Sequence, residues 1–317
     1  MPGSQIHFLL PNIKATTLLF VLFFVLRLAA QKRSPVNYLE QKPPGKTASL
    51  FAPGIISTDS IEHSAPAFSP DGKTVLWAIM KMPSYQTCLL EMNFANNQWS
   101  SPHTPSFSDT TANEVYPNFS MGGDSLFFSS NRKSSPFATR RNTLWYVTRI
   151  PEGWSQAKLL DTNTYKRDIY ASSVSENGTR YYTVGPFRNP DWNIYKTDPF
   201  GKTDSLPSHI NSRGYEDGPF IAPDEGYLIF ESDRQNSPER GGDLYISFRD
   251  KNKNWAVPMN MGPQINSAAT ERFARVSPDG QYLFFGRNTG TGFDIYWIDA
   301  SIINGLRKQA ISEGLLK

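Results

Sequence analysis

Short apolar runs alternate with polar turns along most of the chain, and one pattern of this kind occurs five times. Each copy consists of a short apolar strand, a tight turn and a second apolar strand. The copies are about 50 residues apart and start at Ala65 (APAFSPDGKTVLWA), Tyr116 (YPNFSMGGDSLFFSS), Ala171 (ASSVSENGTRYYTV), Gly218 (GPFIAPDEGYLIFES) and Phe273 (FARVSPDGQYLFFG). This period predicts a β-propeller in which each copy contributes two strands of one blade.

A third strand follows each copy, and apolar character resumes after Trp99, Trp154 and Trp255, which predicts a fourth. The third strands begin at Thr87, Thr143, Trp192, Asp243 and Phe293. The second strands are near-continuous apolar runs, because neighbouring blades cover both faces of a blade. We therefore predict an all-β fold, a five-bladed β-propeller of four-stranded antiparallel blades, with six blades as the alternative.

The ends of the repeat region indicate how the ring closes. Residues 50–57 (LFAPGIIS) precede the first copy and match the sequence that starts at Trp255 and precedes the fifth copy. We expect this N-terminal segment to supply the outer strand of the last blade, beside residues 293–300, because pairing first and last blades removes free sheet edges. The propeller then spans residues 50–300, and residues 301–317 form a C-terminal tail that is more helical than β in character.

The N-terminus differs from the rest, since residues 15–26 (ATTLLFVLFFVL) are apolar apart from two threonines. The run is shorter than the roughly 18 to 20 residues that cross a membrane, so residues 1–30 are predicted to be a signal peptide and the protein to be periplasmic or extracellular. The alternative is an uncleaved N-terminal helix that anchors the protein in the membrane. Residues 31–49 are polar and contain three prolines, which predicts a linker.

Composition narrows the classes of partner and cofactor. Acidic and basic residues are spread evenly and give a formal net charge of +3, so no basic stripe indicates nucleic acid binding. The single cysteine, Cys88, excludes an internal disulfide and a cysteine-based metal cluster. No histidine pair has zinc-binding spacing, and no Gly-x-Ser-x-Gly motif occurs. We predict no metal, no cofactor and no catalytic residue.

Several short motifs are similar to the WD-like repeats of TolB-type β-propellers. Ser-Pro-Asp-Gly occurs at residues 69–72 and 277–280 before an aromatic strand, and the second strands of two copies end in SSNR (129–132) and ESDR (231–234). The resemblance implies a propeller fold and the role of an envelope scaffold or of a lid in a serine oligopeptidase. The third copy departs from the pattern, with SENG at its turn and Pro186 where an arginine would stand.

Charged residues recur at one end of the copies. Six residues before the turn serine or its equivalent stand His63, Glu114, Ile169, Glu216 and Glu271, at the starts of the innermost strands. The second strands run antiparallel and end at Lys81, Arg132, Arg234 and Arg287. We therefore predict three cross-strand pairs around one mouth of the central channel: Glu114 with Arg132, Glu216 with Arg234, and Glu271 with Arg287.

Two interpretations of these residues remain open. They can be structural pairs that hold blade edges together, or His63 and the charged ring can form a ligand-binding face, whose specificity the loops at 133–142 and 235–242 would set. We predict a non-enzymatic exported scaffold that binds a protein or peptide partner of the cell envelope. The alternative is a hydrolase or lyase that acts on a glycan or peptide at a site assembled on the propeller face.

Overall fold

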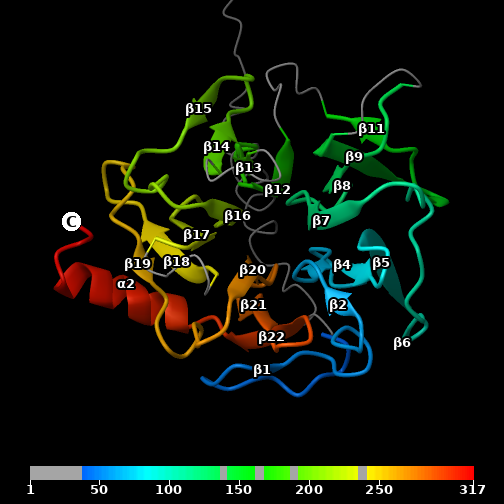
Figure 1. Cartoon of the computed structure of the whole chain (residues 1–317), viewed down its shortest axis with the longest axis horizontal. Coiled ribbons are helices and arrows are strands. Elements are labelled where there is room, and N and C mark those ends of the chain that lie inside the picture. Colours follow the sequence, from blue (N-terminus) through cyan, green and yellow to red (C-terminus); the bar gives the residue numbers. More distant parts are fainter. Residues whose placement is uncertain (1–37, 136–140, 161–167, 186–191, 235–240) are drawn as a thin grey trace, which may run out of the picture. The chain divides into compact units, whose positions relative to one another are not determined.

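The computed structural model describes residues 38–135, 141–160, 168–185, 192–234 and 241–317. Five antiparallel sheets follow one another around a common centre, so the chain forms a β-propeller of five four-stranded blades, as predicted (Figure 1). The innermost strand of each sheet faces the centre, and the later strands of the blade lie progressively further out. The one described helix, α2, follows the last blade.

Each blade is built from strands that are consecutive in sequence. Blade one contains β2 (Ile61–Glu62), β3 (Ala67–Phe68), β4 (Thr74–Lys81), β5 (Gln86–Ala95) and β6 (Gln98–Trp99). Blade two contains β7 (Glu114–Phe119), β8 (Ser125–Ser130), β9 (Thr143–Ile150), β10 (Gly153–Trp154) and β11 (Lys158–Leu159). In blade one the inner strand is divided into β2 and β3, and in blade two the outer strand is divided into β10 and β11.

The remaining blades are undivided. Blade three contains β12 (Ile169–Val174), β13 (Arg180–Val184), β14 (Asn193–Thr197) and β15 (Thr203–Ser205). Blade four contains β16 (Glu216–Ile221), β17 (Tyr227–Ser232), β18 (Asp243–Phe248) and β19 (Met259–Asn260). Blade five contains β20 (Glu271–Val276), β21 (Tyr282–Asn288), β22 (Phe293–Asp299) and β1 (Ser49–Leu50). The third blade therefore keeps the common order of strands although its sequence departs from the repeat.

The recurring turn is held by its own serine. In blade one the Ser69 hydroxyl lies 2.5 Å from Asp71 Oδ1 and accepts a hydrogen bond from the Thr74 N–H at 2.9 Å. In blade five Ser277 makes the same two contacts, with Asp279 and with the N–H of Tyr282. Each Ser-Pro-Asp-Gly sequence thus closes a compact turn in which the glycine has positive φ (Gly72, 69°; Gly280, 74°).

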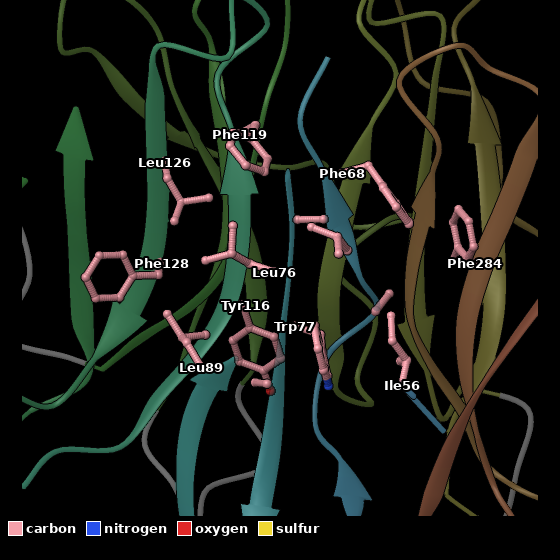
Figure 2. Close-up of a cluster of buried hydrophobic side chains, with 14 of the residues drawn as sticks. Ile56, Phe68, Leu76, Trp77, Leu89, Tyr116, Phe119, Leu126, Phe128 and Phe284 are labelled. Carbon is pink, nitrogen blue, oxygen red and sulfur yellow. The ribbon is translucent and has the colours of Figure 1, made fainter. Parts of the chain in front are cut away.

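The core lies between the blades, where the apolar second strands meet. Phe68 and Leu76 of blade one, Leu126 of blade two and Phe284 of blade five belong to one buried cluster (Figure 2). The rings of Phe68 and Phe284 have centroids 5.8 Å apart, so the first and last blades share a packed surface. The near-continuous apolar runs are explained by this two-sided burial.

The ring closes as predicted, through an N-terminal strand in the last blade. Strand β1 pairs antiparallel with β22, with Ser49 opposite Trp297 and Leu50 opposite Tyr296. The following residues extend the contact, because the Phe51 N–H donates to Ile295 O at 2.8 Å and the Ser57 hydroxyl bonds the backbone of Ile295. The segment found in the sequence therefore joins the first blade to the last.

The segments that flank the propeller are partly packed onto it. Tyr38, in the segment expected to be a linker, is buried, and its ring lies 5.0 Å from that of Phe68 and 5.1 Å from that of Tyr282. Helix α2 (Ile302–Ser312) buries Ile303, Leu306 and Ala310 against the cluster formed by blades four and five. The predicted signal peptide lies outside the described residues. Within the described residues, no helix has the length and apolar character that a membrane crossing requires.

Removing the aromatic anchor of the closing segment should destabilise the whole ring. Phe51 is fully buried and its ring lies 4.9 Å from both Phe284 and Trp297. We expect Phe51→Ala to lower the free energy of unfolding by about 3 to 5 kcal/mol, the usual cost of removing a buried phenylalanine. Urea unfolding of the variant measures this, with Leu50→Ala, the preceding residue but 38% exposed, as a control that should cost less than about 1 kcal/mol. Equal effects of the two substitutions would contradict the closing role.

Candidate functional site at the channel mouth

The three predicted glutamate–arginine pairs are present as ion pairs. Arg234 lies 3.2 Å from Glu216, Arg287 lies 2.8 Å from Glu271, and Arg132 contacts Glu114. The three glutamates are at most 1% exposed. Each arginine also lies over aromatic rings of its own blade, for example 4.7 Å from the centre of the Tyr296 ring for Arg287.

These pairs connect the inner strands to the loops that enter the blades. Glu216 accepts hydrogen bonds from the backbone and hydroxyl of Ser212, and Glu271 does so from Ser267. The arginines donate to backbone carbonyls of the same loops, as in the 2.7 Å bond from Arg287 to Ile265 O. This arrangement fits the structural interpretation of the pairs, and the binding role of the ring stays a prediction. The central parts of the two loops expected to set specificity, 136–140 and 235–240, lie outside the described residues.

Blade one differs from the expected register by one residue. Glu62 pairs with Ile79 in β4, the position that Glu114 and Glu216 occupy opposite Ser130 and Ser232. The Thr58 backbone and hydroxyl bond the Glu62 carboxylate, as Ser212 bonds Glu216. Glu62, and not His63, is therefore the blade-one member of the glutamate set, because the inner strand of blade one contains one more residue before its turn.

Glu62 has no basic partner among the described residues. Lys81 ends the second strand where the other blades place arginine, but its side chain is exposed. Glu62 itself is fully buried, and its Oε2 atom has no hydrogen-bond partner. Burial raises the pKa of Glu62 to about 8, so this carboxyl is protonated at neutral pH.

His63 belongs instead to a second set of residues, which meets at the channel mouth. The residues that follow the strand-start position in blades one, three, four and five are His63, Tyr170, Asp217 and Arg272. The His63 ring lies 6.1 Å from Tyr116 of blade two and 5.4 Å from Phe273 of blade five. Tyr116 in turn interacts electrostatically with Asp217, Arg272, Glu231 and Tyr170. Side chains of all five blades therefore share one space, and we call His63, Tyr116, Tyr170, Asp217, Glu231 and Arg272 the channel-mouth cluster.

Two carboxyl groups of this cluster stand side by side on blade four. Asp217 of β16 pairs directly with Glu231 of β17, so both side chains project from the same face of the sheet. The Gly218 N–H donates to Asp217 Oδ1 at 2.7 Å. Glu231 accepts hydrogen bonds from the Tyr215 hydroxyl and, at 3.3 Å, from Arg272 of blade five, while its Oε2 has no partner.

Burial strongly perturbs the protonation of the cluster. It raises the pKa of Glu231 to about 7, against the opposing effect of Arg272. It also raises the pKa of Asp217, although the hydrogen bond from the Gly218 N–H acts against it. Burial and the charge of Arg272 lower the pKa of His63 to about 4, so its imidazole is neutral at pH 7. A cluster of shifted groups at a channel mouth is a candidate active site.

The residues of the channel-mouth cluster and the adjoining Tyr215 differ in their exposure to solvent. The Glu231 side chain is fully buried, whereas that of Arg272 is 25% exposed, and Tyr215 and His63 are half-buried. Trp192 is half-buried beside them, stacked on Tyr170 at 5.0 Å and edge-on to Tyr215 at 6.5 Å. A ligand at the mouth would therefore meet Arg272, Tyr215, His63 and an aromatic wall first, with the carboxyl groups behind them.

A bulge shapes the inner strand just below the cluster. In blades two to five the register shifts at the residue after the cluster position, and that residue has positive φ: Tyr116 (57°), Ala171 (34°), Gly218 (60°) and Phe273 (59°). Three of these residues are not glycine, so the backbone is strained there. The bulge turns the Tyr116 and Phe273 side chains into the channel.

Sequence analysis missed Asp217, Glu231 and Arg272 because it followed the residues that recur. Most residues of the cluster stand one position after the strand start, where each blade has a different residue type. The available signal was the periodicity itself: side chains of adjacent strand residues point to opposite sides, so the residue after each glutamate had to face elsewhere. Among the described residues no group of three or more His, Cys, Asp or Glu side chains is placed to hold a metal ion.

No protein-family model matches the chain, and no curated protein matches it. Solved structures do resemble it. A gluconolactonase from Xanthomonas campestris matches with a TM-score of 0.49 and 13% identity over 84% of this chain and 97% of that one. An endo-arabinanase from Bacillus licheniformis matches with a TM-score of 0.46 and 14% identity over 78% and 94%. An oligogalacturonate lyase in complex with manganese matches with a TM-score of 0.40 and 10% identity over 76% and 66%.

These comparisons overturn one prediction. The chain was expected to be a non-enzymatic scaffold without catalytic residues, and this prediction is wrong, since the similar solved structures are mostly enzymes. The likeness at such low identity is one of fold. What the chain does must be argued from its own side chains.

The unpaired Glu62 makes a pH-dependent contribution to stability. Its pKa rises from the ordinary 4.5 to about 8 on folding, so the folded protein keeps a proton that the unfolded chain releases between these values. Stability should therefore fall as pH increases from 5 to 8, by up to about 1.4 kcal/mol per pH unit. Unfolding of Glu62→Gln over this range should show a shallower decline, while Glu313→Gln on the exposed end of α2 should follow the wild type. Identical slopes for Glu62→Gln and wild type would contradict the assignment.

Proposed function

We propose that the protein is a glycan-cleaving enzyme whose active site is the channel-mouth cluster. The observation that supports this most is the buried Glu231, with a pKa of about 7, hydrogen-bonded to the half-exposed Tyr215 and to Arg272. A carboxyl group that titrates near neutral pH is suited to move protons. The half-buried Trp192, which is stacked on the buried Tyr170, offers an apolar ring face on which a sugar can stack.

Of the two cleavage reactions, elimination fits the cluster better than hydrolysis. Hydrolysis with two carboxyl groups requires both to touch the sugar, whereas Glu231 is fully buried and Asp217 is 7% exposed. The groups that solvent reaches are the half-buried Arg272 guanidinium, Tyr215 phenol and neutral His63 imidazole. Arg272 can bind the carboxylate of an acidic sugar, which stabilises the negative charge that develops when the adjacent carbon loses its proton. The substrate class we propose is therefore a uronate-containing glycan.

The proton transfers follow from the Tyr215–Glu231 hydrogen bond. Tyr215 takes the proton from the carbon next to the sugar carboxylate while its own hydroxyl proton passes to ionised Glu231. The electron pair of the broken C–H bond forms a carbon–carbon double bond, and the bond from the next carbon to the glycosidic oxygen breaks. The proton held by Glu231 returns through Tyr215 to the leaving oxygen. No oxidant or reductant is needed.

The test uses acidic glycans (polygalacturonate and alginate), a neutral arabinan and a peptide library as substrates. Elimination creates an unsaturated uronate that absorbs ultraviolet light, and hydrolysis creates new reducing ends without that absorbance. We expect the unsaturated product from an acidic glycan, with a rate that rises as pH increases through about 7 because Glu231 must be ionised. Tyr215→Phe and Glu231→Gln should each lower the rate by about 10²- to 10⁴-fold.

The matched control is Tyr195→Phe, a half-buried tyrosine in β14 outside the cluster, which should keep the wild-type rate. All variants are compared after their folding has been checked by near-ultraviolet circular dichroism. A Tyr215→Phe variant that cleaves at the wild-type rate would contradict the proposed mechanism. Turnover of the neutral glycan or of peptides alone would remove the proposed substrate class.

We also propose that the propeller is of the TolB type and is exported. The serine-held turns at Ser69 and Ser277, and the strand endings that place Arg132 and Arg234, support the first proposal. The apolar run at 15–26 supports the second. Mass measurement of the protein from its native cell should show a chain that begins after residue 30. A chain that retains Met1 would instead support the anchored alternative.

A further inference from the structure

A second polar site lies inside the channel, below the channel-mouth cluster. Its main residue is Arg275 of β20, whose guanidinium donates a hydrogen bond to the side-chain oxygen of Asn118 of β7. Strand β20 belongs to blade five and β7 to blade two, and blade one lies between these blades in the ring (Figure 1). The bond therefore crosses from one side of the channel to another. Arg275 and Asn118 each stand two residues before the turn serine of their blade, Ser277 and Ser120, so the bond lies towards the turn end of the inner strands.

Arg275 lacks the acidic partner that four other half-buried arginines have. Arg234, Arg249, Arg272 and Arg287 each lie within 3.3 Å of a glutamate oxygen, whereas no described acid forms an ion pair with Arg275. Its Nε atom has no hydrogen-bond partner. Burial alone lowers the pKa of Arg275 to about 10, so the group is still a cation at neutral pH. Arg275 is half-buried, so its charge is only partly hydrated, and an anion beside it would offset the cost of the lost hydration.

The channel offers a space of the right kind beside this cation. A cavity of about 20 Å³ is lined by Arg275 and by residues of all five blades, among them Ser64, Tyr116 and Ser172. Ser172 is buried and its hydroxyl has no hydrogen-bond partner. The Ser64 hydroxyl accepts a bond from the Ala78 N–H at 2.9 Å, and its own hydrogen remains available for donation. The cavity thus combines a cation with two hydroxyl donors.

The volume restricts the occupant. About 10 to 15 Å³ suffices for a single water-sized particle, so this cavity has room for one atom-sized ligand and is too small for a whole phosphate or sulfate ion. The positive charge of Arg275, with two hydroxyl groups and no described acid in the lining, favours an anion over a cation. We propose that the channel binds a single halide ion, chloride under physiological conditions, between Arg275, Ser172 and Ser64. The bound ion joins strands of different blades and so stabilises the closed ring.

The experiment measures thermal unfolding of the full chain at constant ionic strength while chloride replaces gluconate, which is too large for the cavity. We expect a saturable rise of a few degrees with chloride, and the same with bromide. Arg275→Gln, which removes the positive charge, should lose this dependence. Arg213→Gln, at an exposed position, should keep it. No catalytic activity is measured, so the result is independent of the proposed function.

A structural readout covers the case in which Arg275→Gln does not fold. Crystals of the wild type soaked in bromide should show an anomalous peak between Arg275 and Ser172, and Ser172→Ala should weaken the chloride dependence while leaving Arg275 in place. An anomalous map without a peak in the channel would mean that water fills the cavity, and it would overturn the proposal. A chloride response that is unchanged in both Arg275→Gln and Ser172→Ala would overturn it as well.

Discussion

Five inner strands run side by side around one axis, so the residues at their starts share a space too small to hydrate them all. A charged side chain placed there must pair with an oppositely charged neighbour, become neutral by gaining or losing a proton, or bind a counter-ion. Asp217, Glu231 and Arg272 meet at the mouth under this constraint, and Arg275 stands further down the same channel. The constraint comes from ring closure, because without the β1–β22 pairing the inner strands would have no fixed axis.

The propeller compensates the charged residues at the starts of its inner strands in different ways. Glu114, Glu216 and Glu271 each have an arginine and a loop that donates hydrogen bonds. Each of these glutamates has a cationic partner, which suits a structural role, although Glu114 Oε2 has no hydrogen-bond partner. At Glu62 the arginine is missing and the carboxyl keeps its proton instead. The repeated scaffold thus carries a protonated carboxyl group where one blade lacks the arginine of the others.

The same contrast explains why the sequence favoured a scaffold over an enzyme. The glutamates that recur in the sequence have basic residues at matching positions, and in the structure these residues form ion pairs. The residues that we propose for catalysis are Tyr215, Glu231 and Arg272. They come from the loop before β16, from β17 and from β20, and they share no repeat position. Their low water exposure shifts the pKa of Glu231 towards neutrality, a property that depends on the surrounding blades and not on its sequence neighbours.

The sequence by itself determined the blades, their turns, the closing strand and the three peripheral ion pairs. Each of these depends on contacts between residues in one repeat or on a match between two segments, so periodicity exposes them: Ser69 binds Asp71 two residues away, and Glu271 faces Arg287 across one hairpin. Only the tertiary structure decided that His63, Tyr116 and Arg272 share one space, and that Arg275 reaches Asn118 across the channel. Those contacts join residues of different blades. They also depend on the one-residue shift in blade one and on the bulges of the inner strands, which orient the side chains and have no local sequence signature.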